Sequence, residues 1–181
     1  DRDLDLFIML DTEISEKELE KKGIKIGKMV FKGQKWEKAY SQHPYIRGIY
    51  KGFDVEIVPS YKVNSGTEIK SAVDRTPFHN KYILNKIKEK QKQEVRLLKQ
   101  FMKGIDAYGA DLKNCSMPGY ALELLIIHYE TFENAIKEIS KWNKGKIILF
   151  ENAKEKHAEQ FKGAPLIIID PVDAHRNVAS A

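Results

Sequence analysis

Two acidic pairs, each with one residue between its members, are the part of this sequence best suited to chemistry. The first pair is Asp3 and Asp5, and the second is Asp54 and Glu56. Side chains at positions i and i+2 of a β-strand point to the same face, so each pair shares a face if its segment is a strand. If the two strands are neighbours, three or four carboxylates converge, and their repulsion is costly unless cations occupy the patch.

Such a patch predicts a Mg²⁺ site, because carboxylate oxygens are the ligands that this ion prefers. Two ions about 3.5–4 Å apart activate an attacking hydroxyl and stabilise a leaving pyrophosphate. The D-x-D pattern is also common on strands whose polar face is simply solvated, and the pattern alone leaves both interpretations open. Two features favour the metal site. The apolar run from Leu6 to Leu10 directly follows the first pair, and the second pair recurs about fifty residues later, in a strand that we interpret as an antiparallel neighbour.

The elements that position these acids are predicted by local patterns. We expect strands at residues 1–10, 36–42, 45–50 and 53–61, with turns at 43–44 and 51–52, and a helix at 15–31. Ser15 and Glu18 form a capping-box pattern at the start of the helix, and Gly23 and Gly27 are expected to be weak spots in it. We expect Pro59 to end the last strand, because proline cannot donate to a sheet ladder.

The later part of the chain is predicted to be mainly helical. Apolar residues at helical spacing predict helices at 78–88, 90–103, 119–128 and 132–142, and short strands are expected at 147–150 and 166–170. The charged stretch at 86–92 is the expected junction. We therefore predict two domains, at residues 1–88 and 89–181.

Composition narrows the class of protein. The chain has 181 residues with 42% hydrophobic content, and it has no run of 18 apolar residues that could span a membrane. Its net charge of +5 permits a polyanionic partner such as a nucleic acid. The single cysteine, Cys115, excludes an intramolecular disulfide and fits a reducing cytoplasm.

Eight motifs, in order from one end of the chain to the other, resemble the archaeal CCA-adding enzymes. These are class I tRNA nucleotidyltransferases, in the polymerase-β-like superfamily that also holds poly(A) polymerases. The motifs are the D-x-D followed by Leu-Phe, HPYIRG, KGFDVEIVPSY, KSAVDRTPFH, EVRLLKQFMK, AYGAD, GYALELLI and IIDPVDAHRNVA. Each motif alone is weak, but eight in order are specific.

The resemblance implies an α+β fold, with a polymerase-β-like nucleotidyltransferase mixed sheet flanked by helices and then a mainly helical central domain. It also implies addition of CMP, CMP and AMP to the 3′ end of tRNA from CTP and ATP, with Mg²⁺, in the cytoplasm. Full-length members carry an upstream Gly-Ser motif and a tail that grips tRNA. We expect both to be missing from this chain, the chain alone to be poorly active, and the full-length protein to form a possible homodimer.

The resemblance also implies roles for individual residues. Asp3, Asp5 and Glu56 fall on the metal-binding carboxylates, although the third is more usually Asp; Asp54 is an alternative only if the register moves by two. Thr76 and His79 fall near the ribose and phosphates of the nucleotide. Lys99 and Tyr108 resemble triphosphate contacts, and Arg176 resembles the arginine at the base edge, with Asp173 close by.

Each of these residues also has an ordinary structural interpretation. Lys99 is typical of a surface lysine on an amphipathic helix, and Tyr108 of a residue that packs at a turn. His79 could be a satisfied buried histidine, and Arg176 a cation at a helix end. Alternatives for the whole chain are a poly(A) polymerase or oligoadenylate synthetase of the same superfamily, a non-catalytic RNA-binding module, and a helical scaffold for protein partners.

Overall fold

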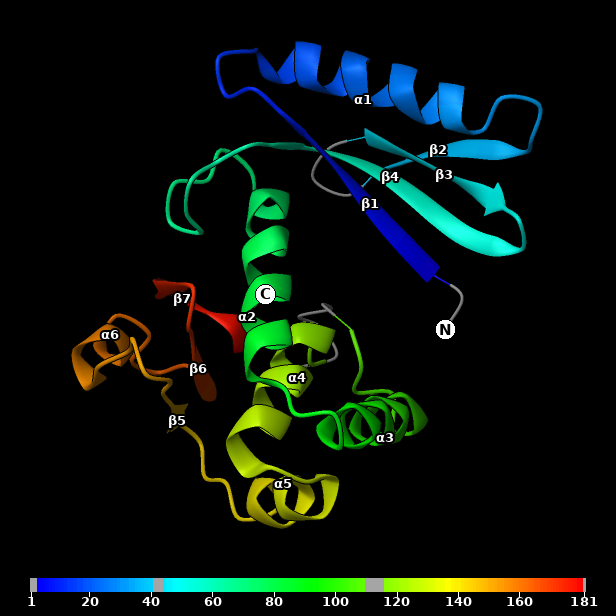
Figure 1. Cartoon of the computed structure of the whole chain (residues 1–181). Coiled ribbons are helices and arrows are strands. Elements are labelled where there is room, and N and C mark those ends of the chain that lie inside the picture. Colours follow the sequence, from blue (N-terminus) through cyan, green and yellow to red (C-terminus); the bar gives the residue numbers. More distant parts are fainter. Residues whose placement is uncertain (1–2, 41–43, 110–115, 181) are drawn as a thin grey trace. The chain divides into compact units, whose positions relative to one another are not determined.

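The computed structural model describes residues 3–40, 44–109 and 116–180, and the chain forms two compact units, Asp1–Phe78 and His79–Ala181 (Figure 1). The division falls within a helix, earlier than the junction that we expect after residue 88. His43 and Cys115, where the sequence places a turn and the single thiol, lie outside the described residues. In the part of the chain that is described, no helix is long and apolar enough to cross a membrane.

The first unit is a four-stranded mixed sheet with one long helix packed against it (Figure 1). The elements are β1 (Asp3–Leu10), α1 (Glu16–Val30), β2 (Trp36–Tyr40), β3 (Pro44–Tyr50) and β4 (Phe53–Tyr61). The strand order is β1-β4-β3-β2, and α1 contacts β3 and β4. The buried core of this unit consists of Phe31, Ile46, Val55 and Ile57. The expected strands and helix are confirmed, with small shifts at their ends.

Helix α1 begins as its sequence predicts but packs in a way that we did not foresee. The Ser15 hydroxyl accepts a hydrogen bond from the Glu18 N–H at 3.4 Å, and the Glu18 carboxylate accepts one from the Ser15 N–H at 3.1 Å. Gly23 and Gly27 are the points where the helix approaches the sheet most closely. A Cβ at either glycine would lie 2.6 Å from a side-chain carbon of the sheet, which at Gly27 belongs to Ile46.

Strands β1 and β4 pair in parallel, so the antiparallel pairing that we expected is wrong. The path of the chain explains the difference. Helix α1 carries the chain back toward the start of β1, and the antiparallel pairs β2–β3 and β3–β4 then reverse its direction twice. As a result β4 runs in the same direction as β1. The side chains at i and i+2 share a face in either orientation, so the acidic pairs still lie together.

Pro59 does not end β4, because the strand continues to Tyr61. Tyr61 donates its backbone N–H to the Asp74 carboxylate, whereas Lys62 donates its N–H to β1. Backbone groups alternate between the two sides of a strand, so the Pro59 nitrogen faces the same side as that of Tyr61, away from β1. Strand β3 pairs with β4 only as far as Ile57, so the missing proline N–H costs no ladder bond.

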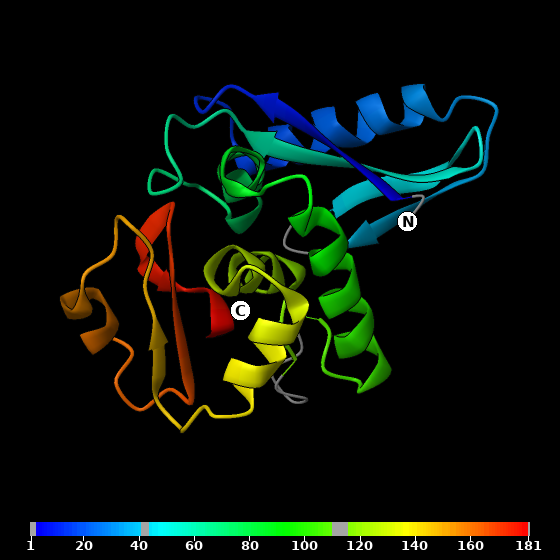
Figure 2. The same ribbon diagram turned by 60° about the horizontal axis from the view of Figure 1, so that its bottom comes forward.

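The second unit combines helices with a three-stranded sheet of order β5-β6-β7. Its elements are α2 (Thr76–Lys86, which begins in the first unit after the 3₁₀ turn Ala72–Arg75), α3 (Gln91–Gly104), α4 (Gly119–Tyr129), α5 (Phe132–Ile139), β5 (Lys146–Ile148), α6 (Glu155–Glu159), β6 (Leu166–Asp170), β7 (Asp173–Asn177) and the 3₁₀ turn Val178–Ser180. Ile168 belongs to the large core with α3, α4 and α5, whereas Ile167 and Ile169 pack in the cluster with α6. In Figure 2 the orange and red strands of this sheet lie between the short orange helix and the yellow-green helices. Burial on both faces explains the unbroken apolar run of β6.

Two elements of this unit were missed in the sequence. Strand β7 consists of polar and small residues without apolar alternation, and the Asn177 amide holds it to β6 by accepting from the Ile168 N–H at 2.8 Å and donating to the Leu166 carbonyl at 2.9 Å. Helix α6 is too short to show a helical period. The expected helix at 132–142 ends earlier, at Ile139, and that at 78–88 begins earlier, at Thr76.

Candidate active site

The two acidic pairs lie side by side on one face of the sheet in the first unit. In the parallel register Asp3 faces Asp54 and Asp5 faces Glu56. Together with neighbouring residues of the sheet they line a hollow of about 660 Å³. Four carboxylates therefore converge on one patch, as the spacing in the sequence predicts.

A cation and a phenol border the Glu56 end of this patch. Arg47 of β3 faces Glu56 in register, and its Nε donates a hydrogen bond to Glu37 Oε1 at 2.5 Å. The Tyr45 phenol lies close enough to the Glu56 carboxylate to act to lower its pKa. Glu56 thus has partners of its own within the sheet.

The negative charges of Asp5 and Glu56, which face each other, are only partly offset by neighbouring groups. Burial, and then the charge of Asp3, raises the pKa of Asp5. Burial, and then the charge of Asp5, raises the pKa of Glu56, and these effects outweigh the lowering by Arg47 and Tyr45. A cation bound between the carboxylates would relieve this repulsion.

The residues fit a divalent cation in charge and donor type. All four carboxylates offer hard oxygen donors, which suit Mg²⁺. Among the residues that the structure describes, no three Asp, Glu, His or Cys side chains are already arranged to hold a metal ion. Asp3 and Asp5 share a face of one strand, and Glu56 lies opposite Asp5 on the neighbouring strand.

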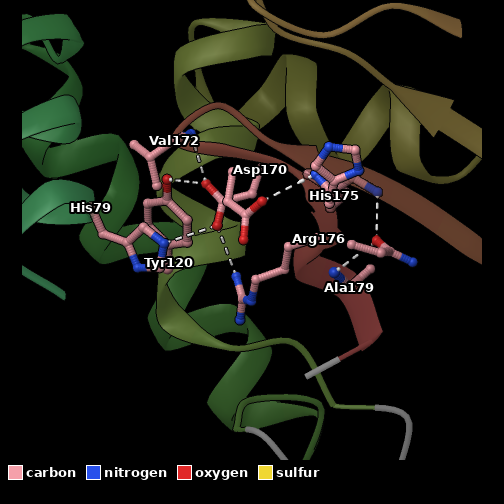
Figure 3. A network of polar contacts seen from close by, with 10 residues as sticks. His79, Tyr120, Asp170, Val172, His175, Arg176 and Ala179 are labelled. Atoms are coloured by element: carbon pink, nitrogen blue, oxygen red, sulfur yellow. Dashed lines mark hydrogen bonds and ion pairs between the residues drawn. The ribbon is translucent and has the colours of Figure 1, made fainter. Parts of the chain in front are cut away.

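A second cluster surrounds a buried carboxylate at the end of β6. The Asp170 side chain is 0% exposed, and four donors reach its two oxygens (Figure 3). Oδ1 accepts hydrogen bonds from the Tyr120 hydroxyl at 3.2 Å and the Val172 N–H at 3.0 Å. Oδ2 accepts from His79 Nε2 at 2.9 Å and Arg176 Nη1 at 3.0 Å. The cluster thus brings together His79 and Arg176, two of the predicted nucleotide contacts.

Stacking and charge order this second cluster further. The His79 ring stacks on the Tyr120 ring with centroids 3.9 Å apart and planes at 18°. Burial acts to raise the pKa of Asp170, but the hydrogen bond and charge of His79, with smaller effects of Val172 and Arg176, outweigh it and lower that pKa. Asp170 is therefore an ionised hydrogen-bond acceptor.

A third cluster lies at the start of α4. Lys99 Nζ forms an ion pair with Glu123 Oε1 at 2.5 Å. A Cβ placed on Gly119 would lie 3.0 Å from the Tyr108 hydroxyl oxygen and 3.5 Å from Lys99 Nζ. The two predicted triphosphate contacts, Lys99 and Tyr108, therefore lie against the same glycine. The first backbone N–H groups of a helix favour anions, so this environment suits phosphate.

The second and third clusters adjoin, because Gly119 and Tyr120 are consecutive residues in the first turn of α4. The structure thereby gathers four predicted nucleotide contacts around this turn, from elements far apart in the sequence: His79, Lys99, Tyr108 and Arg176.

Thr76 is the first residue of α2, three positions before His79 on the same helix. Residues at this spacing lie on one face of a helix. The role of Thr76 near the nucleotide stays a prediction. Asp74, in the same motif, has a structural role. It is 1% exposed and accepts backbone hydrogen bonds from Tyr61, Lys70 and Ser71.

The structure contradicts the ordinary interpretation of one basic residue, Arg176. Arg176 lies within β7 rather than at a helix end. Lys99 lies on the amphipathic helix α3, ion-paired and with a side chain 26% exposed, so the choice between its two interpretations stays a prediction. The carboxylate bonded to Arg176 is Asp170, whereas Asp173, which lies close to Arg176 in the sequence, accepts a hydrogen bond from the His175 N–H at 3.1 Å.

Sequence reasoning missed Asp170, Tyr120 and Glu123 as members of these clusters. A signal existed for Asp170, since an acid that directly follows the buried run of β6 needs partners. The helix around Tyr120 and Glu123 shows only strong apolar character, and its sequence does not indicate which polar residues face a site.

Known proteins resemble this chain over nearly all of its length. A family model described as tRNA nucleotidyltransferase, second domain, matches residues 93–181. The chain is 44% identical over 188 aligned residues to the CCA-adding enzyme of Methanocaldococcus jannaschii, covering 99% of this chain and 42% of that protein. The CCA-adding enzymes of Methanosarcina acetivorans and Archaeoglobus fulgidus are 44% and 40% identical, covering 99% and 98% of this chain and 38% and 39% of theirs.

The family match over residues 93–181 gives the class as tRNA nucleotidyltransferase. Within that class, the chain belongs to the family of archaeal CCA-adding enzymes. It spans about two fifths of the length of these relatives.

Proposed function

We propose that the protein adds CMP, CMP and AMP, without a nucleic-acid template, to the 3′ end of tRNA, using CTP and ATP. The observation that carries the proposal is the 44% identity, over 99% of this chain, to a protein named CCA-adding enzyme. The convergence of the acidic pairs and the clustering of cationic and aromatic side chains at α4 support it.

The proposed metal ligands are Asp3, Asp5 and Glu56, with Mg²⁺ as the ion. Bound Mg²⁺ supplies charge neutralisation for the attacking hydroxyl and the leaving pyrophosphate. Asp5 and Glu56 would hold the ion at the attacking hydroxyl. Asp3 and Asp5 would hold the ion that the triphosphate shares. Phosphoryl transfer needs positioning and charge neutralisation, with little covalent help from the protein.

The proposed nucleotide contacts follow the two clusters at α4. Lys99 and Tyr108 bind the triphosphate, Thr76 and His79 lie near the ribose and phosphates, and Arg176 meets the base edge. The proposal assigns the catalytic carboxylates to a domain at 1–88 and nucleotide binding to one at 89–181. A match of the second-domain family to residues 93–181 supports this division.

The proposed acceptor is tRNA, and the net charge of +5 is compatible with a polyanionic partner. Localisation in the cytoplasm and a homodimer of the full-length protein stay predictions. Cell fractionation and sedimentation would test them.

Nucleotide addition to tRNA lacking its CCA end, with Mg²⁺, CTP and ATP, tests the proposed function. We would assay the chain alone and joined to the flanking segments that its relatives carry, beside an Asp3→Ala, Asp5→Ala double variant. Addition of C, C and A followed by a stop, lost in the double variant, is the expected result. A long A tail would instead indicate a poly(A) polymerase. Absence of addition by the folded protein would favour an RNA-binding module.

A further inference from the structure

We propose that Asp170 is a positioning residue that holds His79, Tyr120 and Arg176 in one arrangement, ready for the incoming nucleotide. The inference rests on the proposed function, because the nucleotide is the ligand that this arrangement receives. Asp170 itself is 0% exposed at its side chain, so it acts through its partners and does not touch the ligand.

Every acceptor position of the Asp170 carboxylate is in use. An ionised carboxylate only accepts hydrogen bonds and offers about four lone-pair positions. Four donors occupy them at 2.9–3.2 Å, and they are His79 Nε2, Arg176 Nη1, the Tyr120 hydroxyl and the Val172 N–H (Figure 3). A buried charge is costly without such partners, so the four bonds hold the carboxylate and its donors in one geometry.

The donors come from separate parts of the second unit. His79 lies on α2, 91 residues from Asp170 in the sequence, and Tyr120 lies on α4, 50 residues away. Arg176 lies on β7. One buried carboxylate thereby sets the mutual positions of side chains from a helix, a second helix and a strand.

Asp170 also fixes how the His79 ring is oriented. Because an ionised carboxylate can only accept, the proton of their hydrogen bond lies on Nε2, and Nδ1 faces away from Asp170. Stacking on Tyr120 at 3.9 Å fixes the plane of the ring. Arg176 uses Nη1 for Asp170, and its 26% exposed side chain keeps further N–H groups for a ligand.

Asp170→Asn tests the proposal, because it keeps the shape and replaces one acceptor oxygen by an NH₂ donor. At least one of the four donors then meets a donor. We expect the affinity of the chain for CTP with Mg²⁺, measured by calorimetry, to fall at least about tenfold, as when a charge-assisted hydrogen bond is lost. A folded Asp170→Asn chain that binds CTP within twofold of wild type would overturn the proposal.

A matched control separates positioning from general destabilisation. Glu94 is a carboxylate in the same unit that accepts a hydrogen bond from the Phe132 N–H at 2.7 Å. Glu94→Gln should lower the melting temperature and leave CTP affinity within twofold. An equal loss of affinity in Glu94→Gln would indicate that Asp170 is merely structural.

A double-variant cycle adds a readout that a structural role would not move. If Asp170 acts through Arg176, then Asp170→Asn should weaken CTP binding much less in an Arg176→Lys background than in the wild type. Full additivity of the two losses would contradict the proposal.

A nuclear magnetic resonance experiment on the wild-type chain needs neither a folded variant nor a bound nucleotide. At a pH where the nitrogen chemical shifts show the ring to be neutral, His79 should have the Nε2–H tautomer with a slowly exchanging ring proton. The Nδ1–H tautomer would overturn the proposal. Failure of the wild type to bind CTP or ATP would count against the proposed function, while the tautomer would still decide the role of Asp170.

Discussion

Asp5 lies directly opposite Glu56 in the parallel register of β1 and β4, and burial together with neighbouring charge raises the pKa of both carboxyls. The ionised forms of these two groups therefore oppose folding in the metal-free chain. The acids are placed for a task other than stability, as is usual for groups that bind cations or ligands.

Replacing Asp5 by Asn should stabilise the metal-free chain. The substitution removes one of the facing charges and keeps the shape, so we expect the melting temperature in chelator to rise by roughly 1–3 °C. Glu68→Gln, which removes an exposed carboxylate of the same unit, is the control and should leave it unchanged. A fall in the melting temperature of Asp5→Asn would count against unrelieved repulsion at this site.

Mg²⁺ should stabilise the chain more at about pH 8 than at about pH 5. The raised pKa values of Asp5 and Glu56 mean that the folded chain binds more protons than the unfolded chain. Their favourable contribution is complete below the unfolded pKa of about 4 and is lost as the pH rises through the folded values. Mg²⁺ binds the deprotonated carboxylates, so it stabilises the folded chain at the higher pH, where the protons no longer do so.

Melting temperatures with and without millimolar Mg²⁺ at the two pH values measure this effect. Asp5→Asn should lose most of the gain at the higher pH. An equal gain at both pH values, or the same gain in Asp5→Asn, would place the bound ion elsewhere.

Gly27→Ala should destabilise the first unit. The new Cβ would lie 2.6 Å from Ile46 Cβ, closer than carbon atoms can approach, so α1 has to move off the sheet. Overpacking of this kind costs about 1–3 kcal/mol. Urea unfolding measures it, with Gly104→Ala as control.

That control has open space around it, since an added Cβ at Gly104 meets no atom within 4 Å. Alanine at the last position of α3 should therefore be neutral or stabilising by up to about 1 kcal/mol. Equal losses in the two variants would argue against close packing at Gly27.

Gly119→Ala should weaken triphosphate binding and leave the fold intact. The added Cβ would lie 3.0 Å from the Tyr108 hydroxyl oxygen and 3.5 Å from Lys99 Nζ, so it displaces the two proposed triphosphate contacts. Calorimetry with CTP and CMP tests the assignment. We expect a loss of about tenfold for CTP and a smaller loss for CMP, whereas equal losses would place the triphosphate away from Gly119.

Much of the first unit could be predicted because its signals are local. The capping box of Ser15 and Glu18 marks the start of α1, and the spacing of Asp3 and Asp5 puts both acids on one face of a strand. The direction of β4 could not be predicted in this way, because it depends on the path of the whole chain through α1 and the β2–β3 hairpin. The glycines of α1 are likewise explained only by the sheet beneath them.

The proposed nucleotide contacts divide in the same manner. By itself, the sequence determined the faces that the acids share, since these follow from local spacing, whereas the nucleotide contacts were proposed from the resemblance of their motifs to a family. Only the tertiary structure decided that Asp170 joins His79 to Arg176 and that Lys99 and Tyr108 both lie against Gly119. The physical reason is that a buried charge takes its partners from whichever elements pack around it, and those elements lie up to 91 residues apart in the chain.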